Sequence, residues 1–150
     1  RRAKISDCKD IWLWRNDLDS IRMFKSKKKV SWSEHKNWYF KAMQNKKCMI
    51  FIGQEKFIKI GVVRFDIHKS AALVSINLAP QMRSKGFSKW LLKKSCEFFF
   101  EKISTPIIAE IAKLNHISMK TFLAVGFIKT AQGVNSDYYK LSLTKKSFKI

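Results

Sequence analysis

The sequence predicts one α/β domain over residues 1–150, with helices packed against a mainly antiparallel β-sheet. The order of helix-like and strand-like segments is helices, three strands, helix, strand, helix and two strands, without an internal repeat or a linker. With 46% hydrophobic residues, twelve Phe and five Trp, the chain can bury a sizeable core, which excludes disorder as its main state. No apolar run approaches the ~20 residues that span a bilayer, so no membrane partner is expected.

Three helices are expected before the sheet. Apolar side chains between Cys8 and Arg15 recur at helical spacing behind Asp7, which can act as an N-cap. Ser31 and Glu34 form a capping box, in which each side chain accepts a hydrogen bond from a free amide of the first turn. The predicted helices cover about 7–16, 17–24 and 31–43.

Strand and helix patterns then alternate. Three stretches rich in β-branched and aromatic residues predict an antiparallel meander, and a helical pattern follows the loop that Pro80 opens. A later helix should start at Asn115 and end at Gly126, which suits a left-handed C-cap. The predicted strands are 48–52, 57–67, 71–78, 106–112, 127–130 and 137–143, and the predicted helices are 87–102 and 115–125.

The chain is strongly basic, with 31 Lys and Arg against 11 acids and a formal net charge of +20. Such a surface attracts polyanions and repels its own copies. Of the bases, 25 are Lys and six are Arg, and they are spread along the chain with one dense run at 25–29. Because base-reading surfaces rely on bidentate Arg, a solvated lysine-rich surface is favoured over a nucleic-acid partner.

Cysteine and histidine usage gives no sign of a metal or a disulfide framework. The three cysteines are widely spaced and form no C-x-x-C pair, which favours a reducing cytoplasm. The three histidines are not spaced as ligands with any cysteine, so no metal site is expected. These residues are Cys8, Cys48, Cys96, His35, His68 and His116.

The segment SINLAPQMRSKGFS, residues 75–88, is the most informative one. A strand ends near Pro80, a basic loop follows, and a long helix starts immediately. Amides at a helix N-terminus carry partial positive charge, Gly86 lets the backbone approach a ligand, and Arg83 and Lys85 add full charges. The segment therefore predicts a pyrophosphate site, with a plain strand–loop–helix connection as the alternative.

Two motifs, in the right order, carry a family resemblance. Arg83-x-x-Gly86-x-Ser88 resembles the Arg/Gln-x-x-Gly-x-Gly/Ala signature of the GCN5-related N-acetyltransferases, and the segment from Asn115 to Gly126-Phe127 resembles a later helix of that family. The resemblance covers nearly the whole chain. It implies the GNAT fold, a mostly antiparallel sheet of about six or seven strands flanked by about four helices, and acetyl-CoA as co-substrate without a metal.

The N-terminal part narrows the resemblance to one branch. It is similar to the enzymes that acetylate the 4-amino group of UDP-linked 4-amino-4,6-dideoxy sugars, whose products enter pseudaminic or legionaminic acid synthesis. This implies a UDP-amino sugar as acceptor, a fused or associated nucleotide-sugar hydrolase, and a monomer or homodimer. The first residue, Arg1, fits a chain cut from a longer one. The similar segments are residues 14–17, 21–22, 30–35, 38–40 and 60–66.

The resemblance also implies how acetyl-CoA is held. The pantetheine would pair like an added strand with the backbone around Asn77 and Leu78, and an amide there would donate to the thioester oxygen as negative charge develops. Asn115 would contact the pantetheine arm or act only as an N-cap. The pyrophosphate would bind backbone amides of Arg83, Ser84, Lys85, Gly86, Phe87 and Ser88.

Three positions depart from the family. Ser88 replaces the final glycine or alanine of the loop motif, but it is small enough to leave the helix start approachable. The tyrosine that protonates the departing thiolate in many members aligns with Phe122, which can line the cofactor site but has no proton to donate. The carboxylate that often serves as base aligns near Leu73. Neither an acid nor a base can therefore be carried over. A sugar amine is less basic than a lysine, so a useful fraction is neutral near pH 7.

Polar side chains on the meander and the first helices remain as candidates. Ser75 and Asn77 are candidates for positioning water, and Asp66 or His68 for a base, with a solvated or structural role as the alternative for each. The acceptor candidates are Arg15, Arg64 and His35 for the diphosphate or sugar, and Trp38 or Tyr39 for stacking on uracil or for core packing.

Three further functions remain open beside acetylation of a nucleotide sugar. The acceptor can instead be a protein or ribosomal-protein amine. A non-catalytic acetyltransferase fold is a second alternative, since reactive side chains are replaced at Phe122 and Leu73. A basic nucleic-acid-binding domain is the third, and its affinity would fall steeply with salt.

Overall fold

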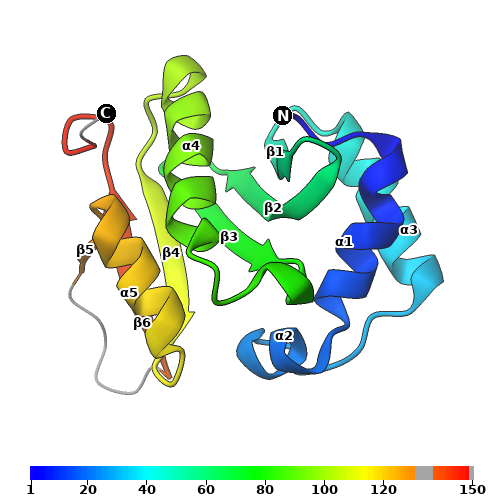
Figure 1. The fold of residues 1–150 in the computed structure, drawn as a ribbon. Coiled ribbons are helices and arrows are strands. Elements are labelled where there is room, and N and C mark those ends of the chain that lie inside the picture. The colour runs from blue at the N-terminus through cyan, green and yellow to red at the C-terminus, as the bar shows by residue number, and fades with distance from the viewer. Residues whose placement is uncertain (131–136, 149–150) are drawn as a thin grey trace.

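A computed structural model describes residues 1–130 and 137–148 and shows a six-stranded sheet between two layers of helices (Figure 1). α1 and α3 cover one face, and α4 and α5 cover the other. The helices are α1 (Cys8–Arg15), α2 (Leu18–Met23), α3 (Trp32–Gln44), α4 (Phe87–Lys102) and α5 (His116–Val125). The strands are β1 (Cys48–Glu55), β2 (Ile58–Ile67), β3 (Ala72–Leu78), β4 (Ile107–Ala112), β5 (Ile128–Lys129) and β6 (Tyr138–Leu143).

The strands lie in the order β1-β2-β3-β4-β6-β5. Each neighbouring pair is antiparallel except β3 and β4, which run parallel. The mixed, mainly antiparallel sheet and its helical layers confirm the predicted fold class. The described residues hold the five α-helices that the sequence pattern predicts, one more than the about four that the family resemblance implies.

Side chains that alternate along the strands build two cores. Val63 and Phe65 of β2 belong to the core under α4 and α5, where Phe65 stacks on Phe99 with ring centroids 4.7 Å apart. Val62, one residue along, belongs to the second core under α1 and α3. Because the period of a strand is two, Arg64 and Asp66 share the face of Val62. The face under α1 and α3 is therefore apolar at β1 and becomes polar toward β3.

The helix boundaries lie within one or two residues of the sequence predictions, whereas one strand and one cap differ. β1 continues to Glu55, beyond the predicted end at 52, since it pairs with β2 as far as Ile58. Ser31 makes the predicted capping box with Glu34. Asp7, in contrast, makes no side-chain cap bond to α1. It is fully buried and binds Arg1, Lys59 and the amide of Lys4 instead.

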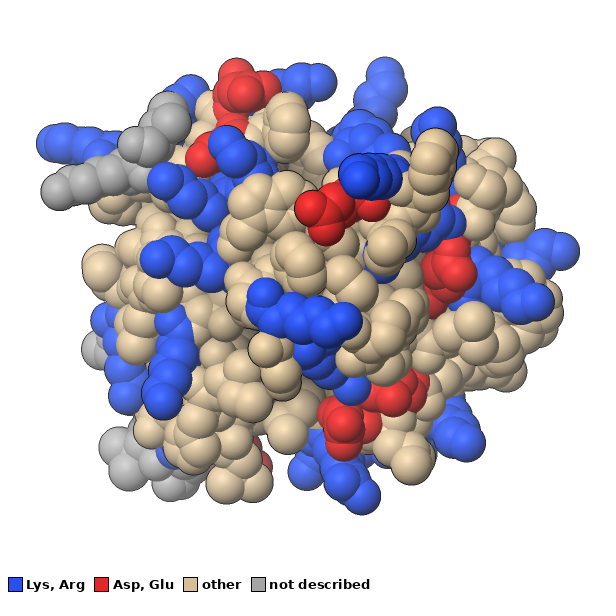
Figure 2. Space-filling model, in the orientation of Figure 1, with Lys and Arg blue, Asp and Glu red and all other residues tan. Residues whose placement is uncertain are grey.

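Lysine and arginine side chains are distributed over the visible face of the molecule rather than gathered in one patch (Figure 2). In the described part of the chain, no helix is both long and apolar enough to cross a membrane. Over residues 1–130 and 137–148, no three His, Cys, Asp or Glu side chains group as metal ligands.

Candidate active site

β3 and β4 stay paired only where they begin. Their register joins Ala72 to Ile107 and Leu73 to Ile108, whereas β3 continues to Leu78 and β4 to Ala112. Beyond these pairs the two strands diverge, as Figure 1 shows. Residues 74–78 and 109–112 border this opening, which we call the β3–β4 gap.

Alternate amides of β3 face the gap. The amide of Ala72 donates to the Pro106 carbonyl, on the β4 side, at 2.8 Å, and the amide of Ala79 donates to the Ile60 carbonyl, on the β2 side, at 2.9 Å. Backbone N–H groups point to opposite sides at successive residues of a strand. The amides that face the gap are therefore those of Val74, Ile76 and Leu78.

These amides can pair with an extended ligand as an added strand would, and can donate to an oxyanion that develops beside them. The predicted donor at Leu78 has the required direction. The alternative at Asn77 does not, because its amide faces β2. Ile76 also faces the gap and was missed by the sequence prediction, which could not tell which edge of the strand would be open.

The loop after β3 presents unpaired amides at the start of α4. Over residues 84–88, no backbone amide donates a hydrogen bond to another described residue. Gly86 occupies the N-cap position of α4 with φ of 80°, and a Cβ built there would meet nothing within 4 Å. Lys85 is exposed beside it. A row of free N–H groups over open space suits a pyrophosphate, so the residues present fit that group.

Arg83 plays a different part from the one expected. Its amide donates to the Pro80 carbonyl at 3.3 Å, so this amide is not free for a phosphate. Its guanidinium donates to Asp17 at 2.6 Å and to the Ser20 hydroxyl at 2.9 Å. Burial opposes ionisation of Asp17, but the hydrogen bonds from Arg83 and from the Ser20 and Asp19 amides, together with the Arg83 charge, outweigh burial and lower the pKa of that carboxyl. Arg83 therefore ties the loop to α2.

The other four residues predicted for the cofactor site belong to α4 and α5; they are Phe87, Ser88, Asn115 and Phe122. Ser88 contacts the Thr121 hydroxyl of α5 at 3.2 Å, and Phe87 packs against the core under α1 and α3. Asn115 accepts from the Ser118 amide at 3.0 Å, which confirms its reading as an N-cap. Phe122 is 2% exposed and packs against Phe127, so it supports the cofactor side of the sheet from within the core.

Two arginines lie near each other on the side of the sheet that α1 and α3 cover, close to the β3–β4 gap. Arg64 lies directly across from Ser75 on β3, and its guanidinium lies over the Trp38 ring at 5.1 Å. Arg15, at the end of α1, lies over the Phe24 ring at 4.1 Å and donates to the Ser26 hydroxyl at 2.7 Å. Burial, together with the nearby charge of Arg64, lowers the pKa of Arg15.

The Arg15 guanidinium lacks a counter-ion in the described structure. Its Nη1 atom is buried and has no hydrogen-bond partner among the described residues. Arg64 Nε lies 2.9 Å from Asp66 Oδ2, without the alignment of a hydrogen bond. Two cations held together with one acid near them form a site that an anion would stabilise.

His35, the third acceptor candidate, is a core residue. It is 3% exposed, and its Nε2 lies 3.0 Å from the Cys8 carbonyl. Burial, with the charge of Arg15, lowers the pKa of its ring. The predicted substrate contact is wrong here, since the ring has almost no free surface. Tyr39 is fully buried too, which supports core packing over stacking on uracil.

The four catalytic candidates separate in the structure. Ser75 borders the gap on the face of Arg64. The side chain of Asn77 is already hydrogen-bonded within the protein. Its Nδ2 donates to the Trp14 carbonyl at 2.9 Å, and its Oδ1 accepts from the Ser20 hydroxyl at 3.1 Å. Asp66 lies across from Leu73, where β3 and β4 are still paired, and His68 is exposed beyond the end of β2. Neither Asp66 nor His68 reaches the open part of the gap.

One carboxylate near the gap was missed. Glu110 lies on β4 between buried Ala109 and Ile111, so its side chain points to the face that carries Ser75 and Arg64. In the sequence, Glu110 is a single acid in an otherwise apolar strand. Its position beside the gap could not be predicted, because the register of β4 against β3 is set by the tertiary structure.

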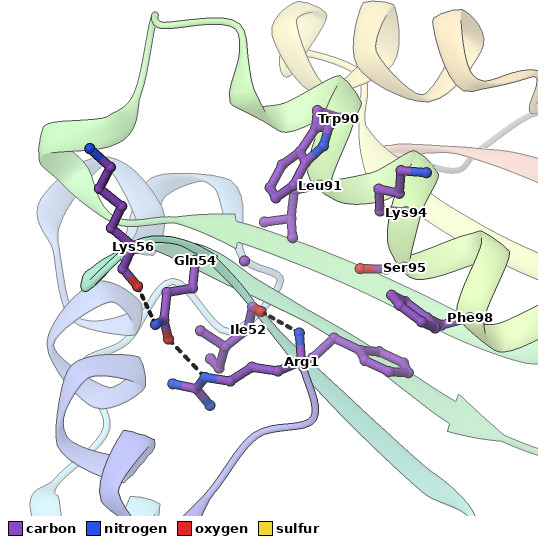
Figure 3. Close-up of a pocket in the computed structure, with 11 residues that line it drawn as sticks. Arg1, Ile52, Gln54, Lys56, Trp90, Leu91, Lys94, Ser95 and Phe98 are labelled. Atoms are coloured by element: carbon purple, nitrogen blue, oxygen red, sulfur yellow. Dashed lines mark hydrogen bonds between the residues drawn. The ribbon is translucent and has the colours of Figure 1, made fainter.

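A separate cavity of about 350 Å³ lies between β1 and α4 (Figure 3). Trp90, Ser95 and Phe98 of α4 line it from one side, and Arg1 and Gln54 from the other. None of the predicted site residues lines this cavity. It lies at the β1 edge of the sheet, away from the β3–β4 gap.

A parallel strand pair that opens beside a loop of unpaired amides suits an extended ligand that carries phosphate groups. The chain matches the family model of the acetyltransferase (GNAT) domain over residues 1–128, so it belongs to this family. It is an acetyl-CoA-dependent N-acetyltransferase of the GNAT type, which confirms the predicted enzyme class and co-substrate.

Solved structures agree on the fold. The spermidine N-acetyltransferase from Vibrio cholerae, crystallised with CoA and spermine, has a TM-score of 0.86 at 19% identity, with 98% of this chain and 95% of that chain covered. The aminoglycoside acetyltransferase AAC(6')-Ib, in complex with coenzyme A, has a TM-score of 0.82 at 13% identity, with 98% and 94% covered. A domain from Methanocaldococcus jannaschii has a TM-score of 0.81 at 18% identity, with 96% of each chain covered. Among curated protein sequences there is no significant match.

Proposed function

We propose that this N-acetyltransferase acetylates the 4-amino group of a UDP-linked 4-amino-4,6-dideoxy sugar. Acetyl-CoA would lie along β3, with its pyrophosphate on the amides of residues 84–88 and its thioester beside the amides that face the gap. The sugar amine would approach from the face of Ser75 and Arg64. Proximity and the backbone donors supply much of the acceleration.

The Arg15–Arg64 pair carries the proposal. Both guanidiniums lie on the acceptor side of the sheet, and Arg15 has no anionic partner among the described residues, which a phosphate would supply. Spermidine and aminoglycosides, the acceptors named for the similar structures, are polycations, which two neighbouring arginines and a net charge of +20 would repel. An acceptor that joins an amine to a diphosphate fits the described charges better.

Release of CoA thiol tests this proposal against a panel of acceptors. The panel contains UDP-4-amino-4,6-dideoxy sugars, spermidine, an aminoglycoside, an N-terminal ribosomal-protein peptide and a reaction without acceptor. We expect acceptor-dependent release with the UDP-amino sugars alone. Turnover of spermidine or the peptide in their place would contradict the proposed acceptor, and equal release with and without acceptor would contradict acetyl transfer.

Arg15→Met tests whether the arginine pair binds the acceptor. Loss of a charged hydrogen bond to phosphate should raise the KM for the UDP-amino sugar about tenfold or more, while the KM for acetyl-CoA stays as in the wild type. Arg22→Met is the matched control, because Arg22 is 74% exposed on α2 and has an exposed partner, Asp19, at 3.8 Å. Equal effects of the two substitutions would reject the subsite.

A further inference from the structure

Glu110 lies across the β3–β4 gap from Ser75. The register that joins Ala72 to Ile107 and Leu73 to Ile108, continued by two residues, places Ser75 opposite Glu110. Both side chains point to the acceptor face, since each is two residues beyond a paired residue of that face. A thioester that lies against β3 in the gap would therefore have Glu110 on its far side.

An ammonium group already occupies this carboxylate. Lys25 Nζ, from the segment after α2, forms an ion pair with Glu110 Oε2 and lies over the Tyr138 ring at 5.0 Å from its centroid. The Lys25 side chain is 60% exposed and that of Glu110 is 34% exposed. An ion pair with this much solvent contact contributes little to stability, so Lys25 can exchange for another ammonium at little cost.

We propose that Glu110 is the catalytic base of this enzyme and that Lys25 occupies the place of the acceptor ammonium until the acceptor binds. The inference rests on the proposed function in requiring an amine acceptor, but not on the identity of the sugar. It supplies the group that the family alignment leaves open at Leu73. The cation contact at Glu110 and the anion contact at Arg15 then orient the two ends of one acceptor.

The proton and bond changes balance as follows. The acceptor ammonium gives one proton to the Glu110 carboxylate and becomes a neutral amine. The amine nitrogen forms a bond to the thioester carbon, whose oxygen takes the negative charge beside the gap-facing amides of β3. As the carbon–sulfur bond breaks, the second proton of the nitrogen passes to the thiolate. The products are the amide, CoA thiol and a protonated Glu110, which releases its proton to solvent.

Three groups face Glu110 from the elements packed around it. Lys25 comes from the segment after α2, Lys140 is its direct cross-strand partner on β6, and Tyr138 lies two residues before Lys140 on the same strand. Ser75 lies across the gap. A base must be ionised to accept a proton, so activity should fall on the acid side of the pH profile.

Glu110→Gln tests the base, with Glu97→Gln as its control. Glu97 also pairs with one lysine, Lys94 at 2.7 Å, but on α4 away from the gap. We expect E110Q to lower kcat about a hundredfold or more at pH 7, to lose the acid limb of the pH profile and to keep the wild-type affinity for acetyl-CoA. E97Q should match the wild type, and E110D, which keeps the carboxylate, should retain more activity than E110Q.

Lys25→Met distinguishes two roles of Lys25: a lysine that only occupies the amine site, and a lysine whose ion pair with Glu110 the site requires. If Lys25 only holds the amine site, K25M keeps kcat and lowers the KM for the acceptor amine. A loss of kcat in K25M equal to that of E110Q overturns the inference, and so does an E110Q enzyme with an unchanged kcat and pH profile.

The outcomes also distinguish this inference from the proposed acceptor. If UDP-amino sugars are inert but another amine in the panel is acetylated, the sugar assignment fails, and E110Q measured with that amine decides the base. A wild-type protein that acetylates no amine overturns both.

Discussion

Asp7 is a carboxylate kept from water between two cations. It is 0% exposed, and Arg1 and Lys59 each reach it at 2.8 Å, with the amide of Lys4 at 2.7 Å. Burial alone would raise its pKa, but the hydrogen bonds from Arg1, Lys59 and Lys4 outweigh burial and hold the pKa well below its usual value. This cluster joins the N-terminal segment to β2.

Asp7→Asn should lower the free energy of unfolding by about 3–5 kcal/mol at pH 7, because two cations lose their buried partner. The folded pKa lies below the unfolded value of about 3.9, so the stabilisation is complete above about pH 4 and disappears as the pH falls further. Urea unfolding at several pH values measures it.

Asp10→Asn is the control for this substitution. Asp10 shares Lys59 at 2.5 Å but is 39% exposed, so its loss should cost less than about 1 kcal/mol. A similar loss of stability in both variants, or a D7N effect that does not shrink below pH 4, would show that burial of the ion pair is not the cause.

At the scale of elements, the site depends on where two strands separate and where one helix begins. Beyond Leu73, β3 is paired only with β2, so the amides of its other edge face the gap. α4 leaves its first amides free because Gly86 caps it without a side-chain hydrogen bond. α2 links the two parts, as Ser20 contacts both Arg83 and Asn77. The short helix α2 therefore contacts both the loop before α4 and the strand β3.

Gly86→Ala should weaken acetyl-CoA binding at least about tenfold, measured by calorimetry. A Cβ at Gly86 meets no protein atom, so the new methyl group would lie where a phosphate approaches the backbone. The positive φ adds about 1 kcal/mol of strain, which lowers stability without blocking a ligand.

Gly126→Ala is the matched control, because it introduces similar backbone strain at a position outside the phosphate site. Gly126 has φ of 105° at the C-cap of α5, and a Cβ there lies at an ordinary 3.7 Å from Leu143. Both variants should melt at similar, slightly lowered temperatures. If G126A weakens acetyl-CoA binding as much as G86A does, the effect comes from lost stability rather than from the phosphate site.

At the scale of the whole molecule, the net positive charge should affect the capture of acetyl-CoA. The net charge is +20, and on the face that Figure 2 shows the basic side chains are spread rather than gathered in one patch, so the field of the molecule attracts the acetyl-CoA anion. We expect kcat/KM for acetyl-CoA to fall several-fold as ionic strength rises from about 0.01 M to about 0.1 M, where the Debye length shrinks from about 30 Å to about 10 Å. Stopped-flow binding and steady-state kinetics measure this dependence.

The turnover number provides the internal control for charge. At saturating substrates kcat should change little, because long-range attraction acts on encounter and not on the bond changes. A kcat/KM that stays flat across this range would show that the net charge has no part in substrate capture.

Particular residues show how far the sequence reached. The capping box at Ser31, the cap at Asn115 and the glycine before α4 are local signals, and each was predicted because its geometry involves residues a few positions apart. The family motif at Arg83 gave the enzyme class. His35 and Asp7 were misassigned, since their partners, Cys8 and Lys59, lie 27 and 52 positions away.

The sequence by itself determined the fold class, the loop that suits a pyrophosphate and the acetyltransferase family, because periodicity, caps and motifs act over short separations. The tertiary structure alone decided which amides face the gap, that Arg83 ties the loop to α2, and that Glu110 lies opposite Ser75. Each of these depends on strand register and on where two strands part, and register is set by the packing of whole faces rather than by neighbours along the chain.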